Sequence, residues 1–230
     1  MGRKIFRSAA FFLALLFVFG TSSSEAALSR QTASGVWSRI AQAAGLRPVP
    51  LQFDSSLKMN AWVKFESSSN YSVSVTQGLL NALESPSELA GILGHEAAHV
   101  TQGHYGKMVG RSLGLGAAAE LINNSNNTLV RLLGLGGLLL AQSGFSREQE
   151  VEADDVGAQI AQRAGFDAWG LHNAMVRLRD QGSVTEPSGF NSHPPTERRL
   201  ERLSRQAGIL QANEKRAVVQ ARSGQEKRAA

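Results

Sequence analysis

Residues 85–100 read SPSELAGILGHEAAHV, and they predict one helix with a polar centre. Ser85 suits the N-cap, Pro86 the first helical position and Glu88 the third, which is the pattern of a capping box. The apolar residues that follow continue the helix as far as Val100. The pentapeptide His-Glu-Ala-Ala-His, residues 95–99, therefore lies inside the helix rather than at one of its ends.

This pentapeptide has the spacing of a zinc site. On a helix, His95 and His99 lie one turn apart on the same face, where two neutral imidazoles can bind one zinc ion. Glu96 lies between them and can take a proton from a zinc-bound water. The alternative is a helix whose histidines only face solvent or core. Because the chain has five histidines, this motif should arise by chance in roughly one such chain in a hundred or fewer.

The composition is that of an ordinary globular protein. The chain has 230 residues, of which 42% are hydrophobic, and a net charge of +5. Residues 197–230 hold nine Lys or Arg and four Glu, an excess equal to the whole net charge. The remainder is close to neutral, which argues against a nucleic-acid-binding core. We expect residues 209–230 to be a basic, partly disordered tail, with contact to an anionic membrane surface or an acidic partner as the alternative.

The N-terminus resembles a targeting segment. Basic residues precede an apolar run from Ala9 to Phe19, and Ser24 and Ala26 suit positions −3 and −1 of a cleavage site. The run is about half as long as a membrane span requires. We therefore expect residues 1–26 to be a cleaved signal peptide, with an uncleaved anchor as the alternative. The chain has no cysteine, so it forms no disulfide bonds.

The rest of the chain predicts a mostly helical α+β fold with a small mixed or antiparallel sheet. Helical patterns cover residues 34–44 and 78–83, and short segments rich in strand-forming residues cover 51–53, 59–65 and 71–75. A capping box at 146–149 begins a further helix, and the last helix is expected to end near Gly208. Gly91 and Gly94 are poor helix formers, so we expect another backbone to pack closely against the motif helix.

The segment 109–143 is apolar and rich in glycine. A packed helical hairpin is the first interpretation. A mobile lid over the site, or a surface that enters lipid, is the alternative. Neither apolar half of the segment is long enough to span a bilayer.

A zinc site built on two histidines needs a third protein ligand. His104 lies nine residues after His95, one short of the spacing in the extended three-histidine motif. We therefore expect His104 to cap the end of the motif helix, where a cation interacts favourably with the helix dipole.

The acidic run at 148–155 is the better source of a ligand, although such a run can also be a solvated face. Glu150 and Asp154 are one turn apart on the same face. Glu150 could bind zinc while Asp154 accepts a hydrogen bond from a ligand imidazole. Glu148 and Glu152 point elsewhere, and we expect them to face water.

Together these motifs resemble the HtpX and CAAX-prenyl-protease (Ste24-like) family of zinc metallopeptidases. The resemblance rests on the pentapeptide at 95–99, on Ser146–Asp154, and on Ser192-His193-Pro194-Pro195 with Arg198. It extends over roughly residues 36–203 and is greatest for the exported bacterial branch, the BepA- and LoiP-like periplasmic proteases. Family members often have a Pro-Gly-Gly turn after the first long strand, where this chain has residues 64–70.

The resemblance implies a gluzincin-type metallopeptidase domain over residues 27–208. It also implies one zinc ion held by His95, His99 and Glu150, with Glu96 as the general base. The protein would then be periplasmic.

Three further residues have a predicted position near the site. His193 either donates a hydrogen bond to the oxyanion or occupies the fourth zinc position at rest, with a purely loop-shaping role as the alternative. We expect Arg198 to pair with a carboxylate near the site, and Asp154 to support a ligand histidine. His172 is expected to be an ordinary surface or core histidine.

The sequence therefore predicts a zinc endopeptidase that hydrolyses unfolded or misassembled envelope proteins, in the manner of a quality-control protease. An extended substrate would lie against the strand at 59–65 by β-augmentation. The alternative function is that of a chaperone or assembly factor for outer-membrane proteins, with latent, self-inhibited protease activity. No nucleic-acid partner is expected.

Overall fold

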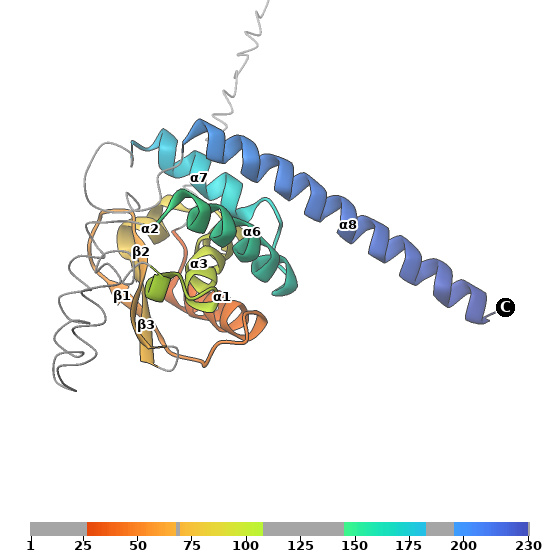
Figure 1. Cartoon of the computed structure of the whole chain (residues 1–230), viewed down its shortest axis with the longest axis horizontal. Helices are drawn as coiled ribbons and strands as arrows, with labels where there is room; N and C mark the ends of the chain where they lie inside the picture. The colour runs from red at the N-terminus through yellow and green to blue at the C-terminus, as the bar shows by residue number, and fades with distance from the viewer. Residues whose placement is uncertain (1–26, 68–69, 108–144, 183–195, 230) are drawn as a thin grey trace, which may run out of the picture.

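A computed structural model describes residues 27–67, 70–107, 145–182 and 196–229. These residues form a mostly helical α+β fold with one three-stranded mixed sheet, as the sequence predicts (Figure 1). The helices are α1 Arg30–Ala43, α2 Gln77–Ala82, α3 Pro86–Thr101, α6 Arg147–Arg163, α7 Gly170–Asp180 and α8 Glu197–Ala229. The strands are β1 Leu51–Asp54, β2 Ala61–Ser67 and β3 Asn70–Thr76.

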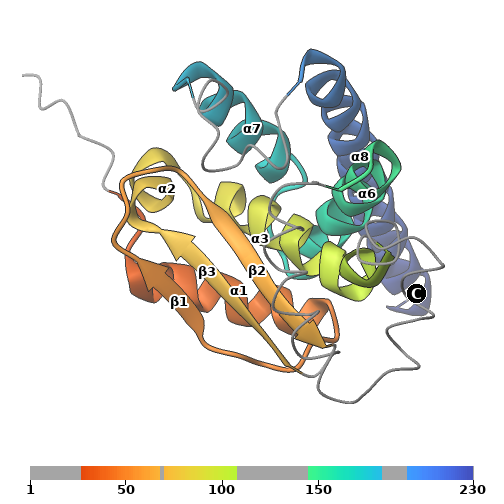
Figure 2. The same cartoon turned by 60° about the vertical axis from the view of Figure 1, so that its left-hand side comes forward.

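The sheet has the order β1-β3-β2. The central strand β3 pairs in parallel with β1, where Leu51 lies opposite Val73, and antiparallel with β2, where Val63 lies opposite the same Val73. Among the described strands, β2 is therefore an edge strand whose outer side pairs with no other strand. α3 runs beside β2, and α1 lies behind the sheet (Figure 2).

The helix α3, which carries the motif, is the centre of the fold. Its residues 88–100 are all buried, and a helix that is buried on every face must be enclosed by other elements. It packs against α1, β2, α6 and α7. Ser85 caps its first turn by accepting a hydrogen bond from the Glu88 backbone N–H at 3.2 Å, as predicted. The other half of the predicted capping box differs, because Glu88 Oε2 accepts from the Glu84 backbone N–H at 2.7 Å rather than from that of Ser85.

Glycines let neighbouring backbones approach α3. A Cβ built on Gly91 would lie 2.3 Å from the backbone nitrogen of Leu171 at the start of α7. A Cβ on Gly94 would lie 2.6 Å from the carbonyl oxygen of Gly157, and one on Gly157 would lie 2.7 Å from the Cα of His95. The close approach predicted from Gly91 and Gly94 is thus confirmed, and α6 provides the matching glycine.

The last helix differs from the prediction. α8 does not end near Gly208 but continues to Ala229, so the basic residues 209–229 are helical. Leu200, Leu203 and Ala207 of its first part are buried. The later residues project away from the rest of the fold (Figure 1). A helix can continue there because none of the residues after Gly208 is a proline.

Several predicted features lie outside the described residues. These are the signal peptide at 1–26, the glycine-rich segment 109–143 and His193. Within the four described ranges, no helix is both long and apolar enough to cross a membrane.

The contact between α3 and α6 predicts a strong effect of one methyl group. Gly157→Ala should lower the free energy of unfolding by about 1–3 kcal/mol, because the new Cβ would collide with the backbone of His95. Gly35→Ala is the matched control, since Gly35 lies in α1 with nothing near its Cβ position. It should stabilise the protein by about 0.5–1 kcal/mol. Urea unfolding measures both values, and equal effects of the two substitutions would contradict the close contact.

Candidate metal centre

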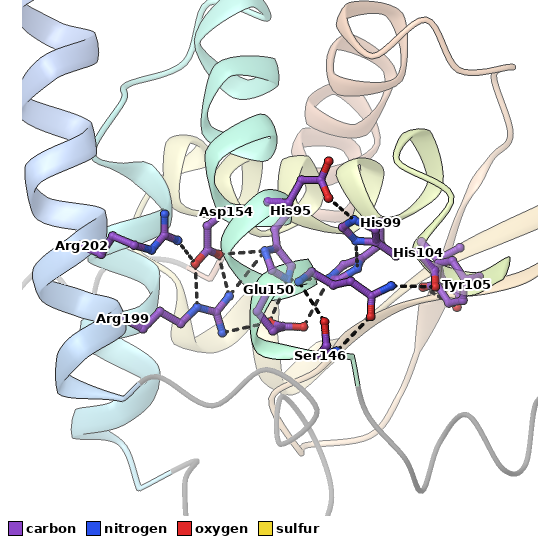
Figure 3. A network of polar contacts seen from close by, with 12 residues as sticks. His95, His99, His104, Tyr105, Ser146, Glu150, Asp154, Arg199 and Arg202 are labelled. Atoms are coloured by element: carbon purple, nitrogen blue, oxygen red, sulfur yellow. Dashed lines mark hydrogen bonds and ion pairs between the residues drawn. The ribbon is translucent and has the colours of Figure 1, made fainter. Parts of the chain in front are cut away.

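Two histidines of α3 and one glutamate of α6 converge inside the fold (Figure 3). The Nε2 atoms of His95 and His99 are 3.0 Å apart. Oxygens of Glu150 lie 3.7 Å from His95 Nε2 and 3.6 Å from His99 Nε2. Ligands placed tetrahedrally at the usual zinc bond length lie about 3.3 Å from each other. The three side chains therefore have the donor types and the spacing that one such ion requires.

The start of α6 puts Glu150 in this position. Ser146 Oγ accepts a hydrogen bond from the Gln149 backbone N–H at 3.3 Å, and Gln149 Oε1 accepts one from the Ser146 N–H at 2.9 Å. This is the capping box predicted from the sequence. The amide Nε2 of Gln149 also donates to the carbonyl of His104 at 3.0 Å. The first turn of α6 is thus fixed both to its own cap and to the chain that follows α3.

A buried carboxylate supports His95 from behind. His95 Nδ1 lies 3.0 Å from Asp154 Oδ1, the contact predicted from the sequence. Arg199 Nε and Nη2 donate to Asp154 at 3.0 and 2.7 Å, and Arg202 pairs with the same carboxylate. Burial acts to raise the pKa of Asp154, but the Arg199 guanidinium and the hydrogen bond from His95 hold it well below its usual range. Arg199 Nη1 also lies 3.4 Å from Glu150 Oε2.

The arginine at this site is not the predicted one. Arg198 is exposed on α8, whereas the adjacent Arg199 is 9% exposed and makes the contacts expected of Arg198. Helical periodicity explains the difference: Leu200 and Leu203 face the core, and Arg198 is on the opposite side of the helix. Marking this buried face in the sequence would have pointed to Arg199.

A second support, which the sequence analysis missed, lies behind His99. His104 Nδ1 is 2.9 Å from His99 Nδ1, and His104 Nε2 is 3.1 Å from Glu152 Oε2. His104 therefore does not cap α3, whose C-cap is Gln102. Gly103 adopts a positive φ of 64°, which ends α3 and turns the chain back. Glu152, expected to face water, is 44% exposed but contacts His104 through one carboxylate oxygen.

Aromatic side chains cover the same end of the site. The ring of Phe145 stacks on His99 with centroids 3.8 Å apart, and Tyr105 lies edge-on to Phe145 at 5.2 Å. Phe65 of β2 stacks on Tyr105 at 5.1 Å. This apolar wall limits the access of water to His99.

Glu96 lies beside the candidate ligands and has the properties of a proton acceptor. Its side chain is almost completely buried. Burial raises the pKa of Glu96 to about 7, against the opposing effects of His95 and of a hydrogen bond from the Val63 backbone. A group that titrates near neutral pH is suited to general acid–base catalysis. The contact with Val63 also places β2 next to this carboxylate.

Comparison with known families gives this geometry a context. The profile of peptidase family M48 matches residues 27–207. The chain belongs to peptidase family M48. In this family the pentapeptide at 95–99 and the cluster of His95, His99 and Glu150 mark a metallopeptidase site. The resemblance noted from the sequence is therefore confirmed.

Several M48 relatives show how far the similarity extends. The chain is 32% identical over 134 residues to the beta-barrel assembly-enhancing protease of Yersinia pestis. The aligned region covers 53% of this chain and 28% of the relative. It is 28% identical over 160 residues to the metalloprotease YcaL of Escherichia coli, covering 68% of this chain and 61% of the relative. A protease HtpX homolog of Salinibacter ruber is 30% identical over 187 residues, 66% of each chain. The chain thus spans less than two thirds of the length of the first two relatives.

The position of Arg199 predicts a contrast between two neighbouring arginines. Arg199→Met should lower the free energy of unfolding by about 3 kcal/mol, because it removes one of the two guanidiniums that balance the buried Asp154 carboxylate. Arg198→Met, which changes an exposed side chain, should alter it by less than about 0.5 kcal/mol. Unfolding of both variants in guanidinium chloride at neutral pH measures these changes in the free energy of unfolding. A larger loss in the Arg198 variant would restore the original prediction.

Proposed function

We propose that this protein is a zinc-dependent endopeptidase that hydrolyses peptide bonds of unfolded or misassembled polypeptides. One observation carries the proposal: His95, His99 and Glu150 converge with the spacing of zinc ligands, beside the buried carboxylate of Glu96. Membership of peptidase family M48 supports the same reaction.

Each residue has a defined task in this mechanism. His95, His99 and Glu150 would hold one zinc ion, which activates a water molecule and polarises the substrate carbonyl. Glu96 accepts a proton from the attacking water and later delivers it to the leaving amine. Asp154 fixes the orientation of the His95 ring through the contact at 3.0 Å. For His193 both predicted roles stand as proposals: it donates a hydrogen bond to the oxyanion, or it occupies the fourth zinc position at rest.

The substrate would bind as an extended strand along β2. Among the described strands β2 lies at the edge of the sheet, and a peptide in extended conformation can add to such an edge through main-chain hydrogen bonds. The Val63 backbone hydrogen-bonds to Glu96, so a peptide bound there would pass beside the proton acceptor. A segment pairs in this way only where its main chain is extended and accessible, as it is throughout an unfolded polypeptide, which supports unfolded polypeptides as the substrate class.

We propose a periplasmic location and a role in the quality control of envelope proteins. The apolar N-terminal run supports export, and a relative named as a beta-barrel assembly-enhancing protease supports clients among outer-membrane proteins. A chaperone or assembly role with latent proteolysis is the second candidate. The adjacent exposed apolar side chains of Val218 and Val219, on a part of α8 rich in Lys and Arg, favour it, since they could contact a client or an anionic membrane surface.

Substitution of the proton acceptor separates catalysis from metal binding. Glu96→Gln should retain zinc but cleave a denatured protein about 10²–10⁴-fold more slowly, because the amide cannot accept the proton. Glu201→Gln, an exposed glutamate on α8, is the control and should cleave at the wild-type rate. Metal content and the rate of cleavage of unfolded outer-membrane protein are measured on the same samples. A zinc-loaded Glu96→Gln protein that cleaves at the wild-type rate would refute the proposed mechanism.

Removal of the metal should act on both activity and stability. A chelator should abolish cleavage and lower the melting temperature, since zinc present at a thousandfold excess over its dissociation constant stabilises the folded state by about 4 kcal/mol. Added Zn²⁺ should restore both properties, and Mg²⁺ should not, because it prefers oxygen ligands. Undiminished cleavage in the chelated, metal-free protein would exclude a metallopeptidase.

A further inference from the structure

We propose that His104 and Glu152 are positioning residues that fix the tautomer of His99, so that its Nε2 presents a lone pair to the metal. The inference rests on the proposed metal site and adds to it a function for two residues outside the ligand set. It follows from the contacts behind His99, from the fixed number of protons on neutral imidazoles and from the burial of His99 and His104.

The first step concerns the two facing nitrogens. His99 Nδ1 and His104 Nδ1 lie 2.9 Å apart, within hydrogen-bond distance. Such a bond needs one N–H and one lone pair, so only one of the two nitrogens carries a proton. The distance alone does not show which of the two nitrogens is the donor.

The carboxylate of Glu152 decides the direction. An ionised carboxylate only accepts hydrogen bonds, so His104 Nε2, at 3.1 Å from it, must carry the proton. A neutral imidazole has one N–H, which leaves His104 Nδ1 as the acceptor. His99 must then donate from its own Nδ1, and its Nε2 is unprotonated. This is the nitrogen that faces His95 and Glu150 in the candidate centre.

The opposite arrangement is unfavourable at both ends. A proton on His104 Nδ1 would place a lone pair of His104 Nε2 against the Glu152 carboxylate. It would also move the proton of His99 to Nε2, where it would block metal binding. Because the His104 side chain is buried, water cannot supply the donor that its Nε2 lone pair would then lack.

The surroundings hold His104 in this position. Gln149 Nε2 donates to the His104 carbonyl at 3.0 Å, and the Phe145 ring covers His99 on one side. The His104–Glu152 pair thus does for His99 what Asp154 does for His95 through its contact at 3.0 Å. Both carboxylates belong to α6, which also provides Glu150.

A pair of variants of similar shape tests the acceptor. His104→Asn can place its carbonyl oxygen where Nδ1 lies, whereas His104→Leu has nearly the same shape but no acceptor. Zinc affinity is measured by competition with a chromophoric chelator. His104→Leu should bind zinc about 10–100-fold more weakly than the wild type, as is typical when a partner of a ligand histidine is lost. His104→Asn should bind zinc clearly more tightly than His104→Leu does. His172→Leu, a histidine outside the site, should leave the affinity unchanged.

A second measurement does not depend on any variant folding. In the zinc-loaded wild-type protein labelled with ¹⁵N, two-bond ¹H–¹⁵N correlation spectra should show His104 protonated on Nε2 and His99 protonated on Nδ1. A proton on His104 Nδ1, or equal zinc affinities of folded His104→Asn and His104→Leu proteins, would overturn the inference. If these results accompanied a wild type that binds zinc and cleaves substrate, the proposed peptidase function would stand. A wild type that binds no zinc would refute both.

Discussion

The direct contact between the backbones of α3 and α6 is the constraint on which the candidate centre depends. Gly94 and Gly157 lie where any Cβ would collide with the facing helix. Two helices with ordinary side chains between them are 8–10 Å apart, and glycines permit a closer approach. Glu150 lies two turns before Gly157 on α6, and His95 directly follows Gly94 on α3. The side chain of Glu150 is therefore long enough to reach the imidazoles of His95 and His99, which lie on a buried helix.

The charges around this contact are distributed unevenly. Asp154 is balanced by Arg199 and Arg202, whereas Glu150 has only the more distant contact with Arg199 at 3.4 Å among its ion pairs with arginine in the described residues. Glu150 is among the causes that raise the pKa of Glu96. A region that holds more negative than positive groups favours a bound cation. The electrostatics and the ligand spacing therefore point to the same kind of occupant.

Much of this arrangement could be predicted from the sequence, because local rules govern it. The start of α3, the capping box of α6 and the spacing of Glu150 and Asp154 each depend on residues within one or two helical turns. The close approach at Gly94 was predictable because glycine inside a helix lowers its stability unless a neighbour needs the space.

The contacts that the sequence did not reveal depend on tertiary structure. His104 faces His99 only because Gly103 turns the chain at the end of α3, and Glu152 reaches His104 from a helix that begins far along the chain. Arg199, rather than Arg198, meets Asp154 because the apolar residues of α8 set the rotation of that helix. The continuation of α8 past Gly208 has a local cause instead, because no proline follows to end the helix. The errors at Arg198 and Gly208 concern one helix, α8, whereas those at His104 and Glu152 concern a contact between segments far apart in the sequence.

The position of α8 in the chain has a consequence for the order in which the molecule matures. A polypeptide made from its N-terminus presents α3 and α6 before the guanidiniums of Arg199 and Arg202. Until they arrive, the carboxylate of Asp154 has no arginine to offset its burial, so water should remain around it and the His95 ring should stay loosely held. The contacts that support His95 in the candidate metal centre would then be completed only when nearly all of the domain is available to fold.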